Sequence, residues 1–399
     1  MHYLVSKDSK GKIRVVEISA SWDESQKGYV IHRITSQYGG KETVQPEILI
    51  TKGKATRTLK EQLNLEYKSN VKKYLDKGYK LLELPINSYT KNKLEEIIGD
   101  VVTDSSGFAK HMLAKKATDV KDSSIEKVKK WYVSNKIDGV RCSFYWKDGE
   151  VKSASRGGGH YDYSTGQIRR HPKFEEFLKN HPDWILDGEL YKHGKSLQQI
   201  SGAARMEKTA DGCDWLEYYI YDVMIPNMPF EERLKVLETI KKELNLSFEP
   251  ERKWEKDDLR VQIVPHVLVE GNNKKDQIMK LHDEWVNEGW EGAVARDASK
   301  NYKFGGRGQE MIKFKSYVDG EFEITGISEG LRPEDMCFTM VTSDGLPFKA
   351  KPMGSRELKE QYRNDLANLI GKYATVKFFY LSDEGTPLQP TLKAIRDYE

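Results

Sequence analysis

The first fifty residues alternate apolar and polar side chains in short runs, such as IRVVEIS at 13–19 and YVIHRIT at 29–35. A period of two is typical of strands that bury one face, and turn-forming residues at 36–40 interrupt the pattern. We therefore predict a small antiparallel sheet.

After Gly53 the apolar period changes to four, which places the apolar residues on one face of a helix: Leu59, Leu63, Tyr67, Val71 and Leu75. Lysines at 60, 68, 72 and 77 fall elsewhere on that helix, and Gly78 is a plausible stop. The first unit should thus be a sheet followed by a basic helix.

The next region mixes strand-like and helix-like runs. WILDGELY (184–191) and YYIYDV (218–223) are typical of strands, whereas FEERLKVLETIKKEL (230–244) and KDQIMKLHDEWVNEG (275–289) are typical of helices. After Ser316, short strand-like runs (EFEITGI, CFTMVT, TVKFFYL) surround one helical stretch at 355–370, which is the make-up of an OB-type barrel. We expect an α+β protein with domains at 1–85, 86–315 and 316–399.

Composition and charge restrict the class of protein. With 38% hydrophobic and 32% charged residues and no apolar run long enough for a membrane span or a signal peptide, we expect a soluble, cytoplasmic chain without a membrane partner. Three widely spaced cysteines permit neither a disulfide framework nor a four-cysteine zinc site. Residues 1–90 carry a net charge of +6 and the rest −3. That segregation suits a polyanion, although solvated lysines on a structural or protein-binding module are the alternative.

Candidate chemistry centres on a lysine that follows a strand-like WYVS run and precedes a turn-forming Asp-Gly pair, in KIDGVR at 136–141. Strand-to-turn placement exposes the tip of Lys136, and taken alone the segment could equally be a surface turn. Downstream, in order, stand SRGG (155–158), DGELY (187–191), YYIYD (218–222), EGAV (291–294) and IKFK (312–315).

The lysine segment and the last four of these resemble motifs I, III, IIIa, IV and V of the nucleotidyltransferase superfamily of ATP-dependent DNA ligases. HMLAKKA at 111–117 resembles the lead-in of that family. The resemblance implies an adenylylation domain followed by an OB-fold domain, ATP and Mg²⁺ as cofactors, and nicked double-stranded DNA as partner. We expect a monomer. Residues 1–85 resemble WGR-type nucleic-acid-binding modules, although the Trp-Gly-Arg signature is absent.

The resemblance also implies residue roles. Lys136 would carry AMP, Glu189 would bind the ribose, Tyr221 would stack on adenine, and Glu291 would hold Mg²⁺. Arg141 and Arg156 would hold nucleotide or nick phosphate, and the further residues that bind ATP or AMP would be Ser134, Lys313 and Lys315. The alternatives are that Glu189 and Glu291 are strand-end surface carboxylates and that Tyr221 is a core tyrosine.

The chemistry requires a neutral lysine, because an ammonium cannot attack the α-phosphate of ATP and an ordinary lysine has a pKa near 10.4. Burial and neighbouring cations lower such a pKa. Lys313 and Lys315, two residues apart on a strand, should point to one face and supply those cations.

The C-terminal LQPTLKAIRDYE (388–399) resembles motif VI of compact ligases, which ends in an arginine and an acidic residue, here Arg396 and Asp397. Gln389 stands where relatives often place an arginine before the proline. Lys393 or Arg396 would then orient the pyrophosphate.

The expected function is that of an ATP-dependent DNA ligase of replication, repair or recombination. The alternatives are an RNA ligase, a capping-type nucleotidyltransferase, and a catalytically inactive scaffold that binds nicks. The lead-in segment, the strand at 320–330 and the compact motif VI favour the DNA ligase.

Overall fold

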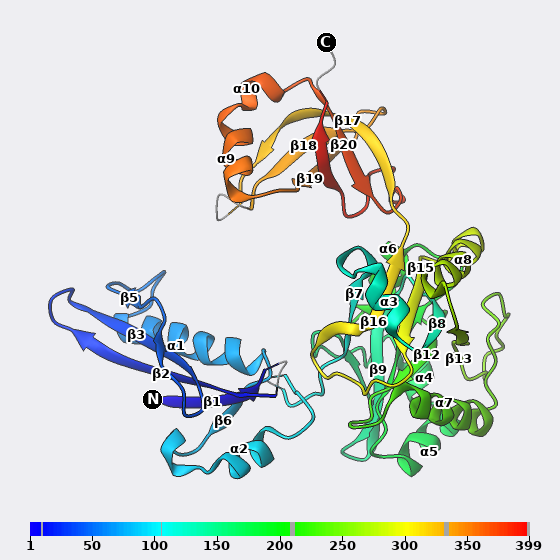
Figure 1. Cartoon of the computed structure of the whole chain (residues 1–399), viewed down its shortest axis with the longest axis horizontal. Helices are drawn as coiled ribbons and strands as arrows, with labels where there is room; N and C mark the ends of the chain where they lie inside the picture. The colour runs from blue at the N-terminus through cyan, green and yellow to red at the C-terminus, as the bar shows by residue number, and fades with distance from the viewer. Residues whose placement is uncertain (9–10, 105, 208–211, 331–334, 397–399) are drawn as a thin grey trace.

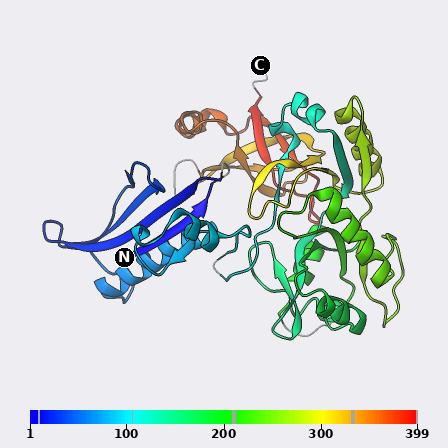
Figure 2. The same ribbon diagram turned by 60° about the horizontal axis from the view of Figure 1, so that its bottom comes forward.

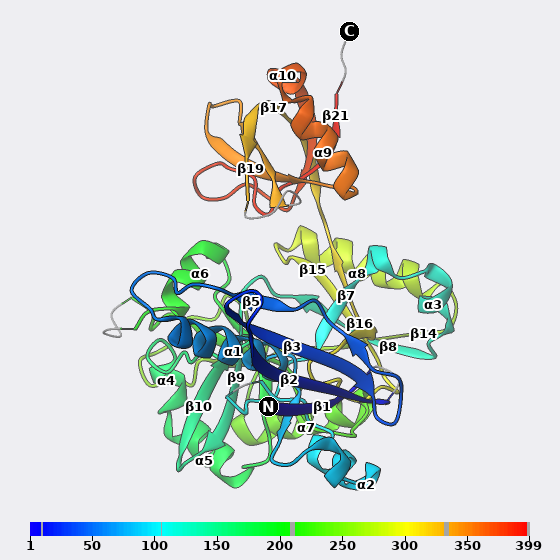
Figure 3. The same ribbon diagram turned by 90° about the vertical axis from the view of Figure 1, so that its left-hand side faces the viewer.

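The computed structural model describes residues 1–8, 11–104, 106–207, 212–330 and 335–396. An N-terminal unit projects to one side of a larger middle domain (Figures 1 and 2), and a C-terminal barrel lies at one end of that domain (Figures 1 and 3). The predicted mixture of helices and strands is confirmed. None of the helices in the described ranges combines the length and the apolar character that a membrane crossing requires.

The N-terminal unit contains the predicted antiparallel sheet, with strand order β4-β3-β2-β1-β6 and β5 paired to β3. Its elements are β1 (His2–Lys7), β2 (Ile13–Asp23), β3 (Gly28–Gln37), β4 (Thr43–Val44), β5 (Ile48–Ile50), α1 (Leu59–Leu75), β6 (Lys80–Leu82), η1 (Ile86–Ser88) and α2 (Lys91–Ile98).

Helix α1 lies where the four-residue period predicts it. Thr58 caps its N-terminus and forms a capping box with Glu61, which satisfies backbone donors that the first turn leaves unpaired. The predicted apolar stripe packs against one face of the sheet, onto Leu4, Ile18 and neighbouring residues. Lysines are therefore left on the solvent side of α1.

Helix α2 covers the opposite face of the same sheet. Leu94 and Ile98 of this helix share a core with Val5 and Val15 of the sheet. The N-terminal unit thus continues to about residue 98, beyond the boundary expected at residue 85, because the sheet buries apolar residues on both faces.

The middle domain is built on two five-stranded sheets, of order β10-β9-β11-β12-β13 and β14-β8-β15-β16-β7. The strands are β7 (Leu113–Lys116), β8 (Lys130–Lys136), β9 (Val140–Lys147), β10 (Glu150–Ser155), β11 (Leu186–Tyr191), β12 (Glu217–Val223), β13 (Val261–Ile263), β14 (Val267–Glu270), β15 (Gly292–Asp297) and β16 (Arg307–Lys315). The helices are η2 (Ala117–Asp119), α3 (Asp122–Lys127), α4 (Gly166–Arg169), α5 (Pro172–Asn180), α6 (Leu197–Ala204), α7 (Phe230–Leu244) and α8 (Lys274–Asn287).

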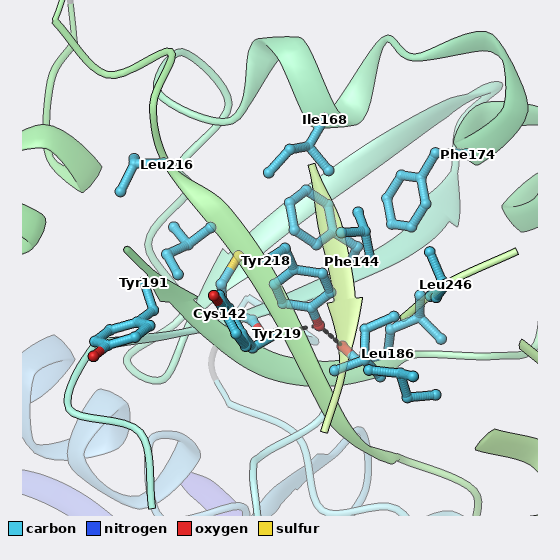
Figure 4. Close-up of a cluster of buried hydrophobic side chains, with 14 of the residues drawn as sticks. Cys142, Phe144, Ile168, Phe174, Leu186, Tyr191, Leu216, Tyr218, Tyr219 and Leu246 are labelled. Carbon is cyan, nitrogen blue, oxygen red and sulfur yellow. Dashed lines mark hydrogen bonds between the residues drawn. The ribbon is translucent and has the colours of Figure 1, made fainter. Parts of the chain in front are cut away.

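Helices cover the outer face of each sheet. α5 and α7 pack on the first sheet, and α8 packs on the second. Figure 4 shows the core of the first sheet, where the Tyr218 ring meets Phe144 edge to face at 4.6 Å and its hydroxyl donates to the Leu186 carbonyl at 2.9 Å. The remaining, inner faces are thereby left to form the site.

Five strands of the C-terminal domain close into a barrel in the order β17-β18-β19-β21-β20. They are β17 (Val318–Ser328), β18 (Cys337–Val341), β19 (Pro347–Pro352), β20 (Tyr373–Phe378) and β21 (Thr391–Ile395), joined by α9 (Arg356–Asn364) and α10 (Leu366–Leu369). The single helix expected at 355–370 is thus divided at Asp365. Asp397 of the C-terminal motif lies outside the described residues.

The loop after β20 connects the barrel to the middle domain. The Tyr380 hydroxyl donates to the Asp138 carboxylate, and the Ser196 hydroxyl donates to Asp383 at 2.7 Å. Phe379 stacks on Tyr317 at 4.7 Å between ring centroids and lies 4.0 Å from the Lys315 ammonium. The barrel therefore contacts Asp138, two residues after Lys136 in the sequence, and Lys315.

Candidate active site

Strand register places the candidate lysines on one face of the second sheet. Lys136, at the end of β8, lies opposite Gly292 of β15, which lies opposite Lys315 of β16. Directly opposed residues point to the same side of a sheet, so Lys136 and Lys315 share a face. Ser134 and Lys313 share that face by the same register, two residues away.

Glu291 joins the two lysines. Its Oε2 pairs with the Lys136 ammonium and its Oε1 with the Lys315 ammonium. The Glu291 side chain is only 6% exposed, so both charges are held in a largely dry environment. The triad of one carboxylate between two cations is the centre of the site.

Two glycines explain why these segments contain Asp-Gly and Glu-Gly pairs. Gly292 has a φ of +144°, and a Cβ there would lie 2.3 Å from the Phe314 carbonyl oxygen. A Cβ on Gly139 would lie 2.3 Å from the Leu190 carbonyl oxygen. Only glycine allows the backbone beside Lys136 to approach both neighbouring strands this closely.

The pKa of Lys136 is raised, contrary to the requirement derived from its chemistry. Burial lowers that pKa, but the charges of Glu291 and Glu189 outweigh burial and favour the ammonium. The pKa values that are lowered are instead those of Lys313 and Lys315, because burial and neighbouring lysines act together there. The pKa of Lys313 falls to about 8. Lys136 is therefore held charged in this arrangement.

The first sheet contributes Glu189 from β11 and Tyr221 from β12. The Tyr221 hydroxyl donates to Glu189 Oε2 at 3.2 Å, and burial raises the pKa of Glu189 to about 7 although Lys136 and Arg141 oppose the shift. Tyr218 and Tyr219 are fully buried in the core, whereas Tyr221 is only partly buried. The third tyrosine of YYIYD is thus the one that meets the site.

The family model described as ATP dependent DNA ligase domain matches residues 111–315, slightly more than half of the chain. The chain belongs to the ATP-dependent DNA ligase family. The matched range begins in the lead-in segment and ends at Lys315, so it encloses both sheets of the middle domain. The resemblance stated from the motifs is confirmed for this domain.

A curated relative is the DNA ligase of African swine fever virus (isolate Tick/Malawi/Lil 20-1/1983), 28% identical over 231 residues, or 53% of this chain and 51% of the relative. The chain spans about half the length of the viral relatives it matches. The solved structure Pmar-Lig_Pre has a TM-score of 0.61 at 17% identity, covering 77% of this chain and 71% of its own. A structure from a study of Lig E DNA ligases has a TM-score of 0.53 at 19% identity, covering 72% and 99%. At these identities the structures show a shared fold.

Within this ligase fold Arg141 is engaged by the protein itself. Its guanidinium binds both oxygens of buried Asp187, at 2.9 and 2.5 Å, and also donates to the Met112 carbonyl and the Tyr302 hydroxyl. Four of its five N–H groups are thus occupied. Arg141 therefore connects separate strands. Only one of its N–H groups remains for the phosphate contact that the resemblance implied.

Arg296 is a residue of the site that the sequence reasoning missed. It is 4% exposed, donates to the Ser134 hydroxyl at 3.1 Å, and lies 5.2 Å from the centroid of the Tyr221 ring. Asp222 binds Arg233 at 2.7 Å and approaches Arg296 at 3.6 Å. The available signal was an aspartate inside an apolar strand, which requires a buried cation nearby.

The remaining candidates lie apart from the triad. Arg156 is exposed in the turn after β10. Lys393 pairs with Asp319 at 2.5 Å and Arg396 pairs with Glu321 at 3.0 Å, both on β17 of the barrel. In this structure the two motif VI cations therefore pair with exposed carboxylates of their own domain and not with groups near Lys136.

The donor set at Lys136 fits a divalent cation only in part. Among the described residues no group of three or more His, Cys, Asp or Glu side chains could hold a metal ion. Glu291 offers carboxylate oxygens, which suit Mg²⁺, and Mg²⁺ takes its other ligands from water and substrate phosphates at such sites. Both oxygens of Glu291 are paired with lysines, so a cation would compete with Lys136 and Lys315 for them.

Proposed function

We propose that this chain is an ATP-dependent DNA ligase that carries AMP on Lys136 and seals nicks in duplex DNA. One observation carries the proposal: motif segments from residue 134 to residue 315 converge on a single, partly buried Lys136–Glu291–Lys315 triad inside the domain that matches the ligase family. Lys136 is the nucleophile because it is the lysine that ends β8, with Glu291 in contact and the charge of Glu189, which accepts from Tyr221, acting on it.

The reaction has three phosphoryl transfers. Lys136 Nζ loses a proton and bonds to the α-phosphorus of ATP as the bond to pyrophosphate breaks. AMP then passes to the 5′-phosphate at the nick, releasing the lysine, and the 3′-hydroxyl attacks that phosphate and expels AMP. The protein acts mainly by positioning and by charge.

The charge state of Lys136 controls the first transfer. Glu291 holds the ammonium, so any displacement of Glu291 from Lys136 lowers the pKa of the lysine toward the reactive amine. Glu291 is the residue that would hold Mg²⁺, and a bound Mg²⁺ would neutralise phosphate charge. Lys315 keeps a cation beside the α-phosphate throughout.

The nucleotide side of the site is assigned in the same way. Glu189 would accept hydrogen bonds from ribose hydroxyls, and Tyr221 would stack on adenine. Arg296, which donates to Ser134, would pack against the Tyr221 ring. Arg156 is exposed and available to nick phosphate. The five-stranded barrel would be an OB fold, and the basic N-terminal unit would bind DNA.

The test is covalent labelling. Purified protein incubated with α-labelled ATP and Mg²⁺ should become labelled. Lys136→Ala should remove the label because no other lysine of the site lies at the end of β8. Lys129→Ala is the matched control, since it removes an exposed lysine that precedes β8 and has no role in the site. Label that persists on the Lys136→Ala variant would contradict the assignment.

Substrate choice separates the related enzymes. Labelling by GTP but not by ATP would favour a capping-type enzyme. Sealing of RNA-containing ends without sealing of an all-DNA nick would favour an RNA ligase, and nick binding without any label would favour an inactive scaffold. We expect labelling by ATP and sealing of the all-DNA nick.

A further inference from the structure

The sheet of the N-terminal unit extends beyond the helix that covers it. Val16 and Ile18 of β2 are at most 1% exposed beneath α1, whereas Ala20 and Trp22, which continue the same face of the strand, are exposed. Trp22 is 43% exposed, and within the described ranges it is the only exposed tryptophan. Because a tryptophan side chain usually buries most of its large apolar surface, this position indicates a surface that binds something.

Trp22 forms an aromatic pair with Tyr29. Strand register places Trp22 of β2 opposite Tyr29 of β3, and the two rings meet edge to face with their centroids 5.0 Å apart. The turn between the two strands is ordered, because Asp23 Oδ1 accepts hydrogen bonds from the backbone N–H groups of Ser25 and Gln26 at 2.8 and 3.1 Å. The pair is therefore held at a defined place on the sheet.

Positively charged side chains adjoin this aromatic pair. Ile50 of β5 lies opposite Tyr29, and the segment that follows it, TKGKATRT at 51–58, contains three cations and no acidic residue. The cations, all of them exposed, are Lys52, Lys54 and Arg57. Lys54 lies 3.8 Å from Glu66 of α1, which neutralises part of the charge. Aromatic rings beside such a segment favour a ligand that combines flat rings with negative charge.

Nucleic acid with unpaired bases has this chemistry. Bases stack on exposed aromatic side chains with little dependence on sequence, while neighbouring cations contact the phosphates. In a duplex the faces of the bases are covered by their neighbours, so an unpaired or terminal base is needed to reach Trp22. The turn between β2 and β3 points away from the middle domain (Figures 1 and 2). A strand bound there would lie outside the nick.

We propose that Trp22 and Tyr29 form a stacking surface for single-stranded nucleic acid, with the cations of residues 51–58 contacting its phosphates. The proposal rests on the proposed DNA binding of the N-terminal unit and extends it from the phosphates of a duplex to unpaired bases. It does not depend on the chemistry at Lys136, because the surface belongs entirely to the N-terminal unit.

The experiment measures binding of the full chain, without ATP, to a labelled nicked duplex with and without a single-stranded oligothymidine tail. The tail should strengthen binding by the wild type, and Trp22→Ala should lose that gain, because loss of one stacked base weakens binding by about tenfold. Trp22→Phe keeps an aromatic ring and should keep most of the gain. The matched control is Tyr38→Ala, which removes an exposed aromatic side chain just beyond the other end of β3.

Three further readouts separate stacking from a structural or an electrostatic effect. Oligothymidine should quench the tryptophan fluorescence of the wild type more than that of Trp22→Phe, because the two proteins differ in this one indole. Trp22→Ala should weaken binding of the tailed nick by a similar factor at low and high salt, because stacking releases no counterions. Adduct formation on Lys136 should match the wild type, so failure of the proposed function would appear separately, as a wild type without label.

The proposal would be overturned if the tail gave the wild type no gain, if Trp22→Ala kept the gain, or if Tyr38→Ala lost it equally. Equal quenching in the wild type and in Trp22→Phe would contradict it as well. Sedimentation of the free proteins tests a second copy of the chain as the occupant. An oligomer that the wild type forms and Trp22→Ala does not form would assign the surface to self-association instead.

Discussion

Two carboxylates near Lys136 have pKa values that move in opposite directions. Burial raises the pKa of Glu189 to about 7, and the opposing charges of Lys136 and Arg141 do not reverse the shift. Burial also acts on Glu291, but the ammonium groups of Lys136 and Lys315 outweigh it and lower its pKa below 4.5. The difference is contact with the cations: Glu291 pairs with two lysines, whereas Glu189 accepts from a tyrosine hydroxyl.

This difference predicts opposite pH dependences of stability for Glu189→Gln and Glu291→Gln. Between pH 4.5 and about 7 the folded state keeps a proton on Glu189 that the unfolded state has lost, so the free energy of unfolding of the wild type falls as pH rises. Glu189→Gln removes this loss, so its stability relative to the wild type should rise between pH 4.5 and about 7 and stay constant above that range.

Glu291→Gln should do the reverse. The folded state releases the Glu291 proton more readily than the unfolded state, so its stabilisation is complete above pH 4.5 and is lost as pH falls through the lowered pKa. The variant should be less stable than the wild type at pH 7, with a deficit that shrinks on acidification. Urea unfolding of the three proteins from pH 8 down to about pH 2 measures both trends, because the Glu291 effect lies below pH 4.5. Parallel curves for the two variants would refute the assignment.

At the scale of secondary structure, one arginine ties separate strands together. Arg141 of β9 binds Asp187 of β11, the segment before β7 at Met112, and Tyr302 before β16. These groups come from both sheets of the middle domain. Asp187 holds Arg141 within the first sheet, and the bonds of Arg141 to Met112 and Tyr302 therefore connect that sheet to segments that lead into the second.

Arg141→Met should accordingly lower stability more than it changes nucleotide binding. Removing one partner of a buried ion pair costs about 3–5 kcal/mol because the other charge stays buried without compensation. Arg141→Met combined with Asp187→Leu should recover part of that loss, since neither charge then remains. Thermal unfolding of single and double variants measures the effect. If Arg141→Met is stable but needs a much higher ATP concentration for labelling, Arg141 is instead a phosphate ligand.

Periodic segments were predictable from the sequence, and their tertiary partners were not. α1 and α7 lie where the apolar spacing indicates, because packing of one face decides a helix of this length. The helix at 355–370 divides at Asp365, whose backbone angles of φ −99° and ψ 12° lie outside the α-helical region. The role of α2 was missed because Leu94 and Ile98 are buried only by packing on β1 and β2, which lie far away in the sequence.

The candidate site shows the same limit. Lys136, Glu189, Tyr221 and Glu291 could be chosen because ordered motifs mark them, and the structure brings them together. The pairing of Arg141 with Asp187 spans 46 residues and that of Arg296 with Ser134 spans 162. Sheet register decides such pairs, and a one-residue change of register would have moved each side chain to the opposite face.

Over the whole molecule, positive charge is concentrated on the unit most remote in sequence from the barrel. Lys60, Lys68 and Lys73 are exposed on α1, whose apolar stripe is already packed on the sheet. A second basic surface, lined by Lys7, Arg14, Lys41 and Lys77, borders a cavity of about 670 Å³ on the same unit. Asp8 neutralises Arg14 there, which leaves α1 as the simpler candidate for DNA phosphates.

The triple variant Lys60/Lys68/Lys73→Gln should weaken nick binding without affecting formation of the AMP adduct on Lys136. Each phosphate that a lysine neutralises contributes about −0.9 to the slope of log affinity against log salt, so loss of three contacts should flatten that slope by up to about 2.7. The matched control is Lys241/Lys242/Lys256→Gln, which removes three exposed charges from the middle domain. Nick affinity is measured by titration at several salt concentrations. Because salt competes with the phosphate contacts, the difference between the triple variant and the wild type should be largest at low salt and should narrow as salt rises. If the triple variant and its control show the same slope, the lysines of α1 are a solvated surface and the N-terminal unit serves another contact.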